Sequence, residues 1–153
     1  MKEKDERPRP KGRSSYKKFF KFQTRWRDND QYGHMNNAVY YELFDSAVNK
    51  FLIETGTLDV AGSETVFLVA SSSCNYFTEV AYPSDVEIGV SISRLGFSSI
   101  TYELGLFVEG ENETAAAGIY VHVNVNSTNQ QPCAIDDLAR IKCAELMLKT
   151  KSI

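Results

Sequence analysis

The residues of this chain best suited to chemistry lie between Asp28 and Asn37, directly before a stretch with a helical pattern. Two carboxylates, Asp28 and Asp30, precede Gly33, which permits close backbone approach and unusual φ angles. The first N–H groups of a helix have no partner within the helix and favour nearby negative charge. A carboxylate beside such amides can act as acid, base or nucleophile where an oxyanion develops. The segment therefore predicts acyl-transfer chemistry.

The elements that must position this segment are a strand before it and a helix after it. Lys18 to Trp26 alternates as in a strand, and Val39 to Glu54 repeats apolar residues with a helical period before Thr55-Gly56 can end the helix. Four further strands and a C-terminal helix are expected at Thr65–Phe77, Val86–Ser93, Ser98–Glu109, Thr114–Asn126 and Asp136–Lys149. Strands grouped after one long helix, without β-α-β alternation, predict an α+β domain with the helix packed on one antiparallel sheet.

Length and composition fit one ordinary domain. The 153 residues are 42 % hydrophobic and 24 % charged, which is usual for a globular protein. The net charge of −3 conceals a basic start, since residues 1–18 hold eight Lys or Arg and three acidic residues. We expect residues 1–16 to be a flexible basic leader and residues 17–150 to be a single domain. Because the rest of the chain is acidic and shows no nucleic-acid-binding motif, no nucleic-acid partner is expected.

The chain has no apolar run long enough for a membrane span and no signal-peptide core near Met1. Its three cysteines are widely spaced and lack a CxxC pair, so we expect reduced thiols and neither disulfides nor a zinc site. The predicted location is the cytoplasm. A mitochondrial presequence is the alternative suggested by the basic leader, although the acidic residues and prolines of the leader disfavour one.

The run from Asp28 to Tyr40 resembles a family signature. Its order, Asp-x-Asp-x-x-Gly-His-x-Asn-Asn-x-x-Tyr, is similar to that of hotdog-fold acyl-CoA thioesterases of the 4-hydroxybenzoyl-CoA thioesterase-like family. Asp45 stands at the acidic helix position where Glu is more usual, and the resemblance extends over residues 18–135. It implies a curved antiparallel sheet wrapped around one long central helix. It also implies an acyl-CoA substrate, no cofactor or metal, and a homodimer or homotetramer whose active sites are shared between protomers.

By this resemblance Asp30 is the catalytic carboxylate, acting as nucleophile or as the general base that activates water. The sequence does not distinguish these two routes. The local alternative is that Asp30 only caps the turn before the helix. Asp45 is the second candidate for catalysis, and its alternative is a structural acid on the helix surface. Asp28 is expected to hold the loop through local hydrogen bonds.

Groups between Gly33 and Asn37 are expected to bind the substrate. Gly33 makes room for close approach, and the amides from His34 through Met35 to Asn37 predict an oxyanion site for the thioester carbonyl. The imidazole of His34 can orient that carbonyl, assist Asp30 or hydrogen-bond across a subunit interface. The side chain of Asn37 has a second expected role, as the N-cap of the helix.

Residues outside this segment are expected to complete the substrate site. Tyr40 is predicted to belong to the core and to the wall of an acyl pocket. Ser98 and Ser99 match a strand start where, in the family that the chain resembles, the backbone approaches the pantetheine or phosphates of CoA. Basic residues such as Arg94 or Lys142 can pair with CoA phosphates. The sequence does not define the acyl chain.

The predicted function is hydrolysis of an acyl-CoA thioester to a free carboxylic acid and CoA. A thioesterase acting on acyl carrier protein and a non-catalytic acyl-CoA sensor are the alternatives within the same fold. The sensor predicts ligand binding without turnover, and an intact Asp30 argues against it. A hotdog hydratase or dehydratase is disfavoured because its characteristic motifs, with a paired His and acid, are absent.

Overall fold

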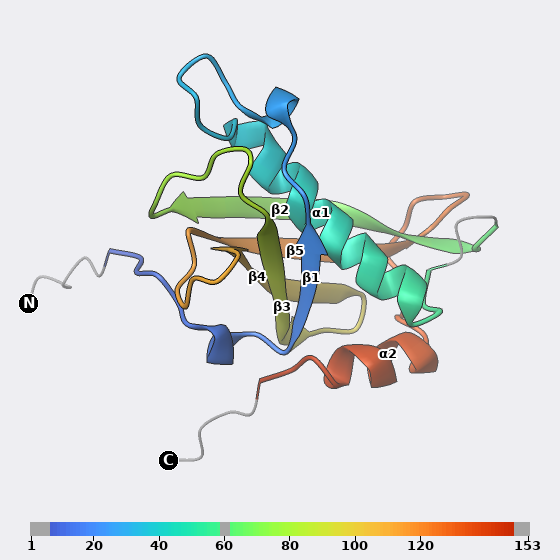
Figure 1. The fold of residues 1–153 in the computed structure, drawn as a ribbon. Helices are drawn as coiled ribbons and strands as arrows, with labels where there is room; N and C mark the ends of the chain where they lie inside the picture. The colour runs from blue at the N-terminus through green and yellow to red at the C-terminus, as the bar shows by residue number, and fades with distance from the viewer. Residues whose placement is uncertain (1–6, 59–61, 149–153) are drawn as a thin grey trace, which may run out of the picture.

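The computed structural model describes residues 7–58 and 62–148, which contain five strands and two α-helices (Figure 1). The strands are β1 (Lys18–Phe22), β2 (Thr65–Tyr76), β3 (Val86–Leu95), β4 (Ser99–Val108) and β5 (Ala116–Asn126). The helices are α1 (Asn37–Glu54) and α2 (Asp137–Ala144), and two 3-10 turns are η1 (Arg13–Ser15) and η2 (Trp26–Asp28). Within these residues, no helix has the length and apolar character needed to cross a membrane.

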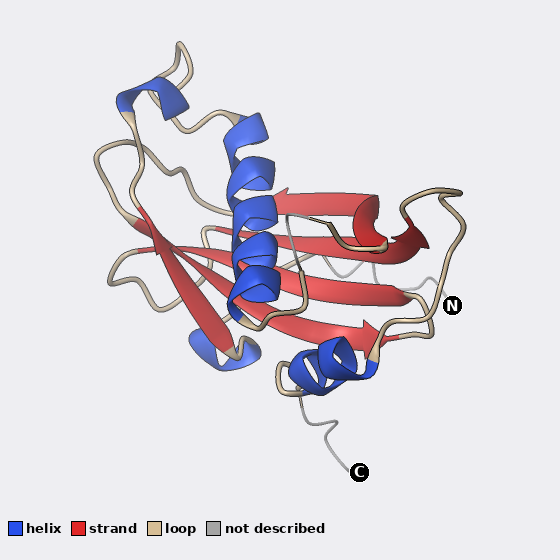
Figure 2. Cartoon of the chain, turned by 90° about the vertical axis from the view of Figure 1, so that its right-hand side faces the viewer, coloured by secondary structure: helices blue, strands red, loops and turns tan. Residues whose placement is uncertain are grey.

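The strands form one antiparallel sheet in the order β1-β3-β4-β5-β2. β3, β4 and β5 follow one another as hairpins, whereas β1 and β2 add the two edges. The long helix α1 crosses one face of this sheet, and the strands curve around it (Figure 2). This arrangement confirms the predicted α+β hotdog fold, a curved antiparallel sheet wrapped around one long central helix.

The apolar face of α1 forms the core with the facing side of the sheet. Its buried side chains are those of Val39, Tyr40, Phe44, Ala47, Val48, Phe51 and Leu52. Phe44 passes so close to β5 that a Cβ at Gly118 would lie 2.9 Å from its ring. Burying a Phe side chain in this way stabilises the fold by about 1.5–3 kcal/mol. Gly56, at a φ of +72°, ends the helix in the left-handed conformation expected for Thr55-Gly56.

The first described residues lie against the outer face of the sheet, where a free leader was expected. The ring of Tyr16 is buried over Gly89 and Gly105, a cross-strand pair on β3 and β4. A Cβ at these glycines would lie 2.7 Å and 2.4 Å from that ring, so a side chain at either position would displace it. Residues 11–16 also exchange hydrogen bonds and ion pairs with the domain and belong to it. Residues 1–6 of the expected leader lie outside the described part.

The first strand is shorter than its pattern predicted. Alternation continues to Trp26, but β1 ends at Phe22, which pairs with Val86 at the start of β3. Beyond this pair no other strand of the described residues lies beside the chain. The alternating residues after Phe22 therefore have no neighbouring strand with which to form backbone hydrogen bonds. Instead, Thr24 donates its hydroxyl to the Ser84 carbonyl at 2.6 Å, and η2 begins at Trp26. The chain thereby turns towards the start of α1.

The C-terminal helix is shorter too. α2 begins after Asp136, as predicted, but it ends at Ala144, whereas the predicted end at Lys149 lies outside the described residues. After Ala144 the chain meets β3 at its bulge, where the N–H of Ile92 donates to the Leu146 carbonyl at 3.0 Å. This contact with the sheet replaces a further helical turn.

Candidate active site

Asp28 and Arg25 hold the loop that begins the site. Asp28 is buried, and its carboxylate accepts hydrogen bonds from the Arg25 N–H at 2.7 Å and from the Arg25 guanidinium at 2.9 Å. Burial opposes ionisation of Asp28, but these hydrogen bonds and the positive charge beside it keep its pKa below the usual value. The Asp28 carbonyl accepts from the Asn36 N–H at 2.8 Å, which ties η2 to the start of α1. The predicted structural role of Asp28 is confirmed.

Asp30 lies at the turn that Gly33 closes. Its Oδ1 accepts hydrogen bonds from the N–H groups of Tyr32 at 2.8 Å and His34 at 3.4 Å, and its carbonyl accepts from Gly33 at 3.1 Å. Gly33 has a φ of +81°, a conformation that favours glycine. Asp30 therefore caps the turn with one oxygen. The other oxygen, Oδ2, makes no hydrogen bond to any described residue and is free to meet a ligand.

The backbone amides before α1 are mostly used within the protein. Of the four amides expected to form the oxyanion site, three donate to protein groups, namely those of His34, Met35 and Asn36. The fourth, the N–H of Asn37, forms no hydrogen bond among the described residues. The predicted oxyanion role was wrong for these three amides. The amides of His34 and Asn36 donate to groups of the same loop, and that of Met35 donates to Val80 in the segment after β2. The N-cap is also Asn36 and not Asn37, since the Asn36 side chain accepts from the Ala38 N–H at 2.9 Å.

A cavity of about 320 Å³ brings most of the predicted residues together. One wall comes from the loop and α1, with Asp30, His34, Met35, Asn37 and Tyr40. The opposite wall comes from the end of β2 and the segment after it, with Tyr76, Phe77, Thr78 and Glu79. The Met35 N–H donates to the Val80 carbonyl at 2.7 Å, and this hydrogen bond holds the two walls together.

Glu79 was not predicted from the sequence. Its carboxylate lies 3.0 Å from Nε2 of His34, and both side chains are partly exposed. Nδ1 of His34 has no partner among the described residues. A carboxylate at one ring nitrogen orients an imidazole, so that the other nitrogen can exchange a proton with a ligand. Glu79 carries no sequence signal of its own, because it reaches His34 only through the fold.

Tyr40 and Tyr76 close the cavity with two aromatic rings. The rings meet edge to face, with centroids 4.9 Å apart. Burial, with Cys74 and Glu79 nearby, raises the pKa of Tyr40 to about 12, and burial also raises the pKa of Tyr76. Both side chains are neutral phenols at physiological pH and can donate a hydrogen bond to a ligand. Tyr40 thus lies in the core and in the cavity wall, where it was expected.

Other predicted residues lie away from this cavity. Asp45 is exposed on α1, where its charge adds to burial in raising the pKa of Tyr120. Ser98 and Ser99 lie at the turn between β3 and β4, at the opposite end of the sheet from the cavity. Arg94 lies at that end as well. Within one protomer, the fold therefore does not bring these residues to Asp30.

The chain matches a known protein family over most of its length. A family model described as the Thioesterase-like superfamily matches residues 24–141. The chain belongs to this superfamily. The match spans the loop with Asp30, the whole of α1 and the strands from β2 to β5. Membership of the Thioesterase-like superfamily supports thioester hydrolysis as the general reaction and confirms the resemblance to hotdog thioesterases.

Solved structures and a curated protein are similar to this superfamily member. The PA5185 protein from Pseudomonas aeruginosa strain PAO1 is 49 % identical, with a TM-score of 0.89 over 91 % of this chain and 97 % of that chain. A predicted thioesterase from Bacillus stearothermophilus is 25 % identical, with a TM-score of 0.75 over 86 % and 97 %. The YsmA protein of Bacillus subtilis (strain 168) is 29 % identical over 116 residues, which are 75 % of this chain and 78 % of that protein.

Proposed function

We propose that the protein hydrolyses an acyl-CoA thioester to a free carboxylic acid and CoA. The observation that carries this proposal is that Asp30, with one free carboxylate oxygen, lines the same cavity as Asn37, whose N–H is free. A nucleophile or base beside an anion-stabilising donor is what thioester hydrolysis requires. Membership of the Thioesterase-like superfamily supports the same reaction.

Asp30 can act in two ways. As general base it takes a proton from water, and the water oxygen bonds to the thioester carbonyl carbon. As nucleophile it bonds to that carbon itself and forms a mixed anhydride, which water then cleaves. In both routes the carbonyl oxygen becomes an anion that the Asn37 N–H, at the positive end of α1, stabilises. The C–S bond then breaks, and CoA leaves as a thiolate that takes up a proton.

The side chains around Asp30 assist this reaction. His34, oriented by Glu79, offers Nδ1 to the carbonyl or to the attacking water. The rings of Tyr40 and Tyr76 form a wall against which the acyl group packs. Hydrolysis changes no oxidation state, so the reaction needs no redox cofactor, and in this proposal the Asp30 carboxylate takes the role of activating water or attacking the carbonyl.

We further propose that the active form is a homodimer, or a homotetramer built from such dimers. β2 is an edge of the sheet, and its middle residues, including Leu68 and Val69, are exposed. A long, exposed edge strand is a template for pairing with another chain. Pairing of β2 with β2 of a second copy would bring Tyr76 and the cavity to the interface. Ser98 and Ser99 keep their predicted role only if the second copy supplies them.

The test measures CoA thiol release from short-chain, long-chain and aryl acyl-CoAs by the native protein, Asp30→Asn and Asp45→Asn. Asp30→Asn removes the charge and keeps the shape, so we expect kcat/KM to fall about 10²- to 10⁴-fold with an unchanged circular dichroism spectrum. Asp45→Asn makes the same change on the exposed side of α1.

Three results would redirect the proposal. A loss of turnover in Asp45→Asn alone would move catalysis to the helix carboxylate. Binding of acyl-CoA by the native protein without thiol release would refute hydrolysis and leave the sensing function. Thiol release from acyl carrier protein thioesters, but not from acyl-CoAs, would show that the substrate is an acyl carrier protein thioester. The proposed role of Asp30 in hydrolysis would then stand.

A further inference from the structure

Two large aromatic side chains stand in solvent next to the loop that carries Asp30. Trp26 of η2 is 74 % exposed, and Tyr82, in the segment between β2 and β3, is 42 % exposed. Their rings meet edge to face, with centroids 6.1 Å apart. Trp and Tyr are large amphipathic side chains, and adjacent exposed ones mark surfaces at which a soluble protein binds a ligand or a partner.

The aromatic pair and the cavity are built from the same two segments of chain. Trp26 lies on the segment that continues through Asp30 into α1, and Tyr82 lies on the segment that follows Glu79. The Asn29 side-chain oxygen accepts a hydrogen bond from the Tyr82 N–H at 3.1 Å, directly beside Asp30 in sequence. This bond holds the two segments together outside the cavity, so the aromatic pair has a fixed place beside the loop that carries Asp30.

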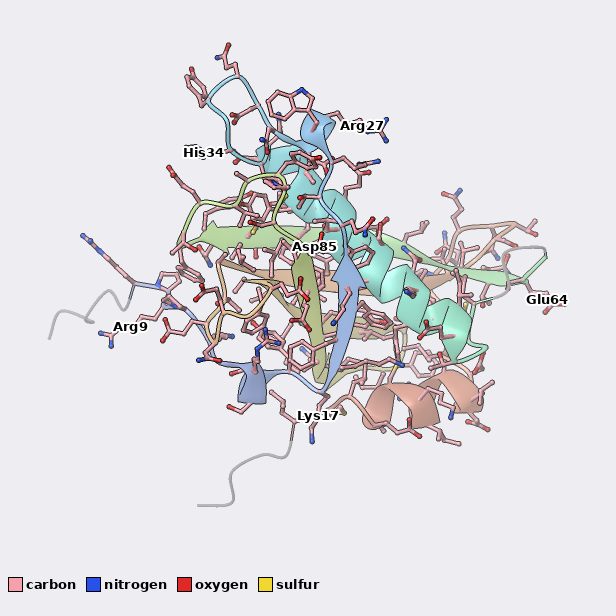
Figure 3. The ribbon with its side chains drawn as sticks, in the orientation of Figure 1. Arg9, Lys17, Arg27, His34, Glu64 and Asp85 are labelled. Carbon is pink, nitrogen blue, oxygen red and sulfur yellow. The ribbon has the colours of Figure 1, made fainter. Side chains whose placement is uncertain are left out.

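Arg27, next to Trp26 in the sequence, adds an exposed positive charge to this surface. Its neighbour Arg25 is engaged by Asp28 at 2.9 Å and by Glu42 at 3.5 Å. Arg27 is exposed and forms no ion pair with any residue that the structure describes. Figure 3 shows Arg27 and His34 at the end of the molecule where α1 begins, on opposite sides of that end. A guanidinium without a partner is suited to bidentate pairing with phosphate.

The other side of the cavity is acidic. A second cavity of about 410 Å³ shares Thr78 and Glu79 with the first and is also lined by Glu111 and Glu113. Phosphate groups placed there would meet charges of their own sign, which is unfavourable at short range. A ligand that carries several phosphates is therefore directed away from this acidic cavity and towards Arg27.

We propose that Trp26, Tyr82 and Arg27 bind the adenine nucleotide end of CoA. This inference rests on the proposed acyl-CoA function and adds the place where the nucleotide is held. The adenine stacks on the exposed indole, Arg27 pairs with phosphate, and the pantetheine arm leads from this surface along the loop to Asp30. Stacking of a base on an aromatic side chain and pairing of Arg with phosphate both contribute strongly to nucleotide affinity.

Trp26 is the single tryptophan of the chain, so its fluorescence reports directly on this surface. We expect CoA to quench the fluorescence in a saturable titration and pantetheine to leave it unchanged. Arg27→Gln should weaken CoA binding about tenfold, the effect of one charge-assisted contact. Arg9→Gln is the matched control, because it removes the same charge from an exposed position that has no predicted role in binding and lies away from Arg27 (Figure 3). No quenching by CoA, or equal weakening by both variants, would overturn the proposal.

Turnover gives a separate readout. Trp26→Ala should raise KM for an acyl-CoA about tenfold with kcat near native, whereas hydrolysis of the matching acyl-pantetheine should not change, because that substrate has no nucleotide. Equal losses with both substrates would make Trp26 a structural residue and overturn the inference. If CoA quenches Trp26 but no thioester releases thiol, the nucleotide site stands and the proposed hydrolysis fails.

Discussion

We predict that His122→Phe makes the protein more resistant to acid. His122 lies on β5 and is 2 % exposed, with its ring stacked on Phe67 and edge-on to Tyr102 at centroid distances of 6.2 and 5.3 Å. Neither ring nitrogen has a hydrogen-bond partner among the described residues. Burial therefore penalises the charged ring and lowers the pKa of His122 from 6.5 to about 4.

The magnitude follows from these two pKa values. Above pH 6.5 the ring is neutral in the folded and the unfolded chain, and it adds little pH dependence. Between pH 6.5 and about 4 the unfolded chain binds a proton that the folded protein does not, so stability falls as the pH is lowered. Each pH unit inside this window costs about 1.4 kcal/mol. His122 alone then accounts for a loss of about 2 kcal/mol between pH 7 and pH 5.

The assay is urea unfolding followed by circular dichroism at pH 7, 6 and 5, with both proteins at one concentration. We expect the free energy of unfolding of the native protein to fall about 2 kcal/mol more than that of His122→Phe. His34, the other histidine, is present in both proteins, as is every carboxylate. Equal pH dependence in the two proteins would refute a buried, neutral His122. A changed m-value would instead show that the substitution altered the unfolding transition itself.

Three further substitutions probe the site and its support. Asn36→Ala removes the side-chain cap of α1 and should lower the free energy of unfolding in urea by about 1 kcal/mol. Gly105→Ala puts a methyl group 2.4 Å from the Tyr16 ring and should destabilise by about 1–3 kcal/mol, but much less in a Tyr16→Ala background. Glu79→Gln should lower kcat for thiol release about tenfold, because it loosens the His34 ring, and should leave the melting temperature unchanged, because the pair is exposed.

Each of these substitutions has a control that can contradict it. Asn36→Ser supplies another good cap, so a loss equal to that of Asn36→Ala would rule out capping as the cause. The same cost of Gly105→Ala in both backgrounds would mean that the aromatic ring does not press on this glycine. Glu113→Gln removes a nearby negative charge without touching His34, so an equal fall in kcat would reduce the effect of Glu79 to general electrostatics.

Local signals were enough to predict α1 and the loop before it. The apolar period of Val39–Glu54 and the conformations of Gly33 and Gly56 depend on residues close in the chain, and the sequence predicted all three, although α1 begins two residues earlier, at Asn37. The cap was the exception. Asn36 and Asn37 have the same side chain, and only the extended backbone at Asn36 selects it as the N-cap. A choice between two identical neighbours depends on where the helix begins, which the surrounding contacts decide.

The sequence by itself determined the fold class, the superfamily and one wall of the cavity, because these are recorded in short-range patterns of polarity and spacing. Only the tertiary structure decided the other wall, where Glu79 meets His34 after the chain has passed through α1 and β2. It also decided which amides remain free, since the Val80 carbonyl takes the N–H of Met35. Such pairings depend on which segments meet in space and compete for each hydrogen bond, and no local pattern of residues records that.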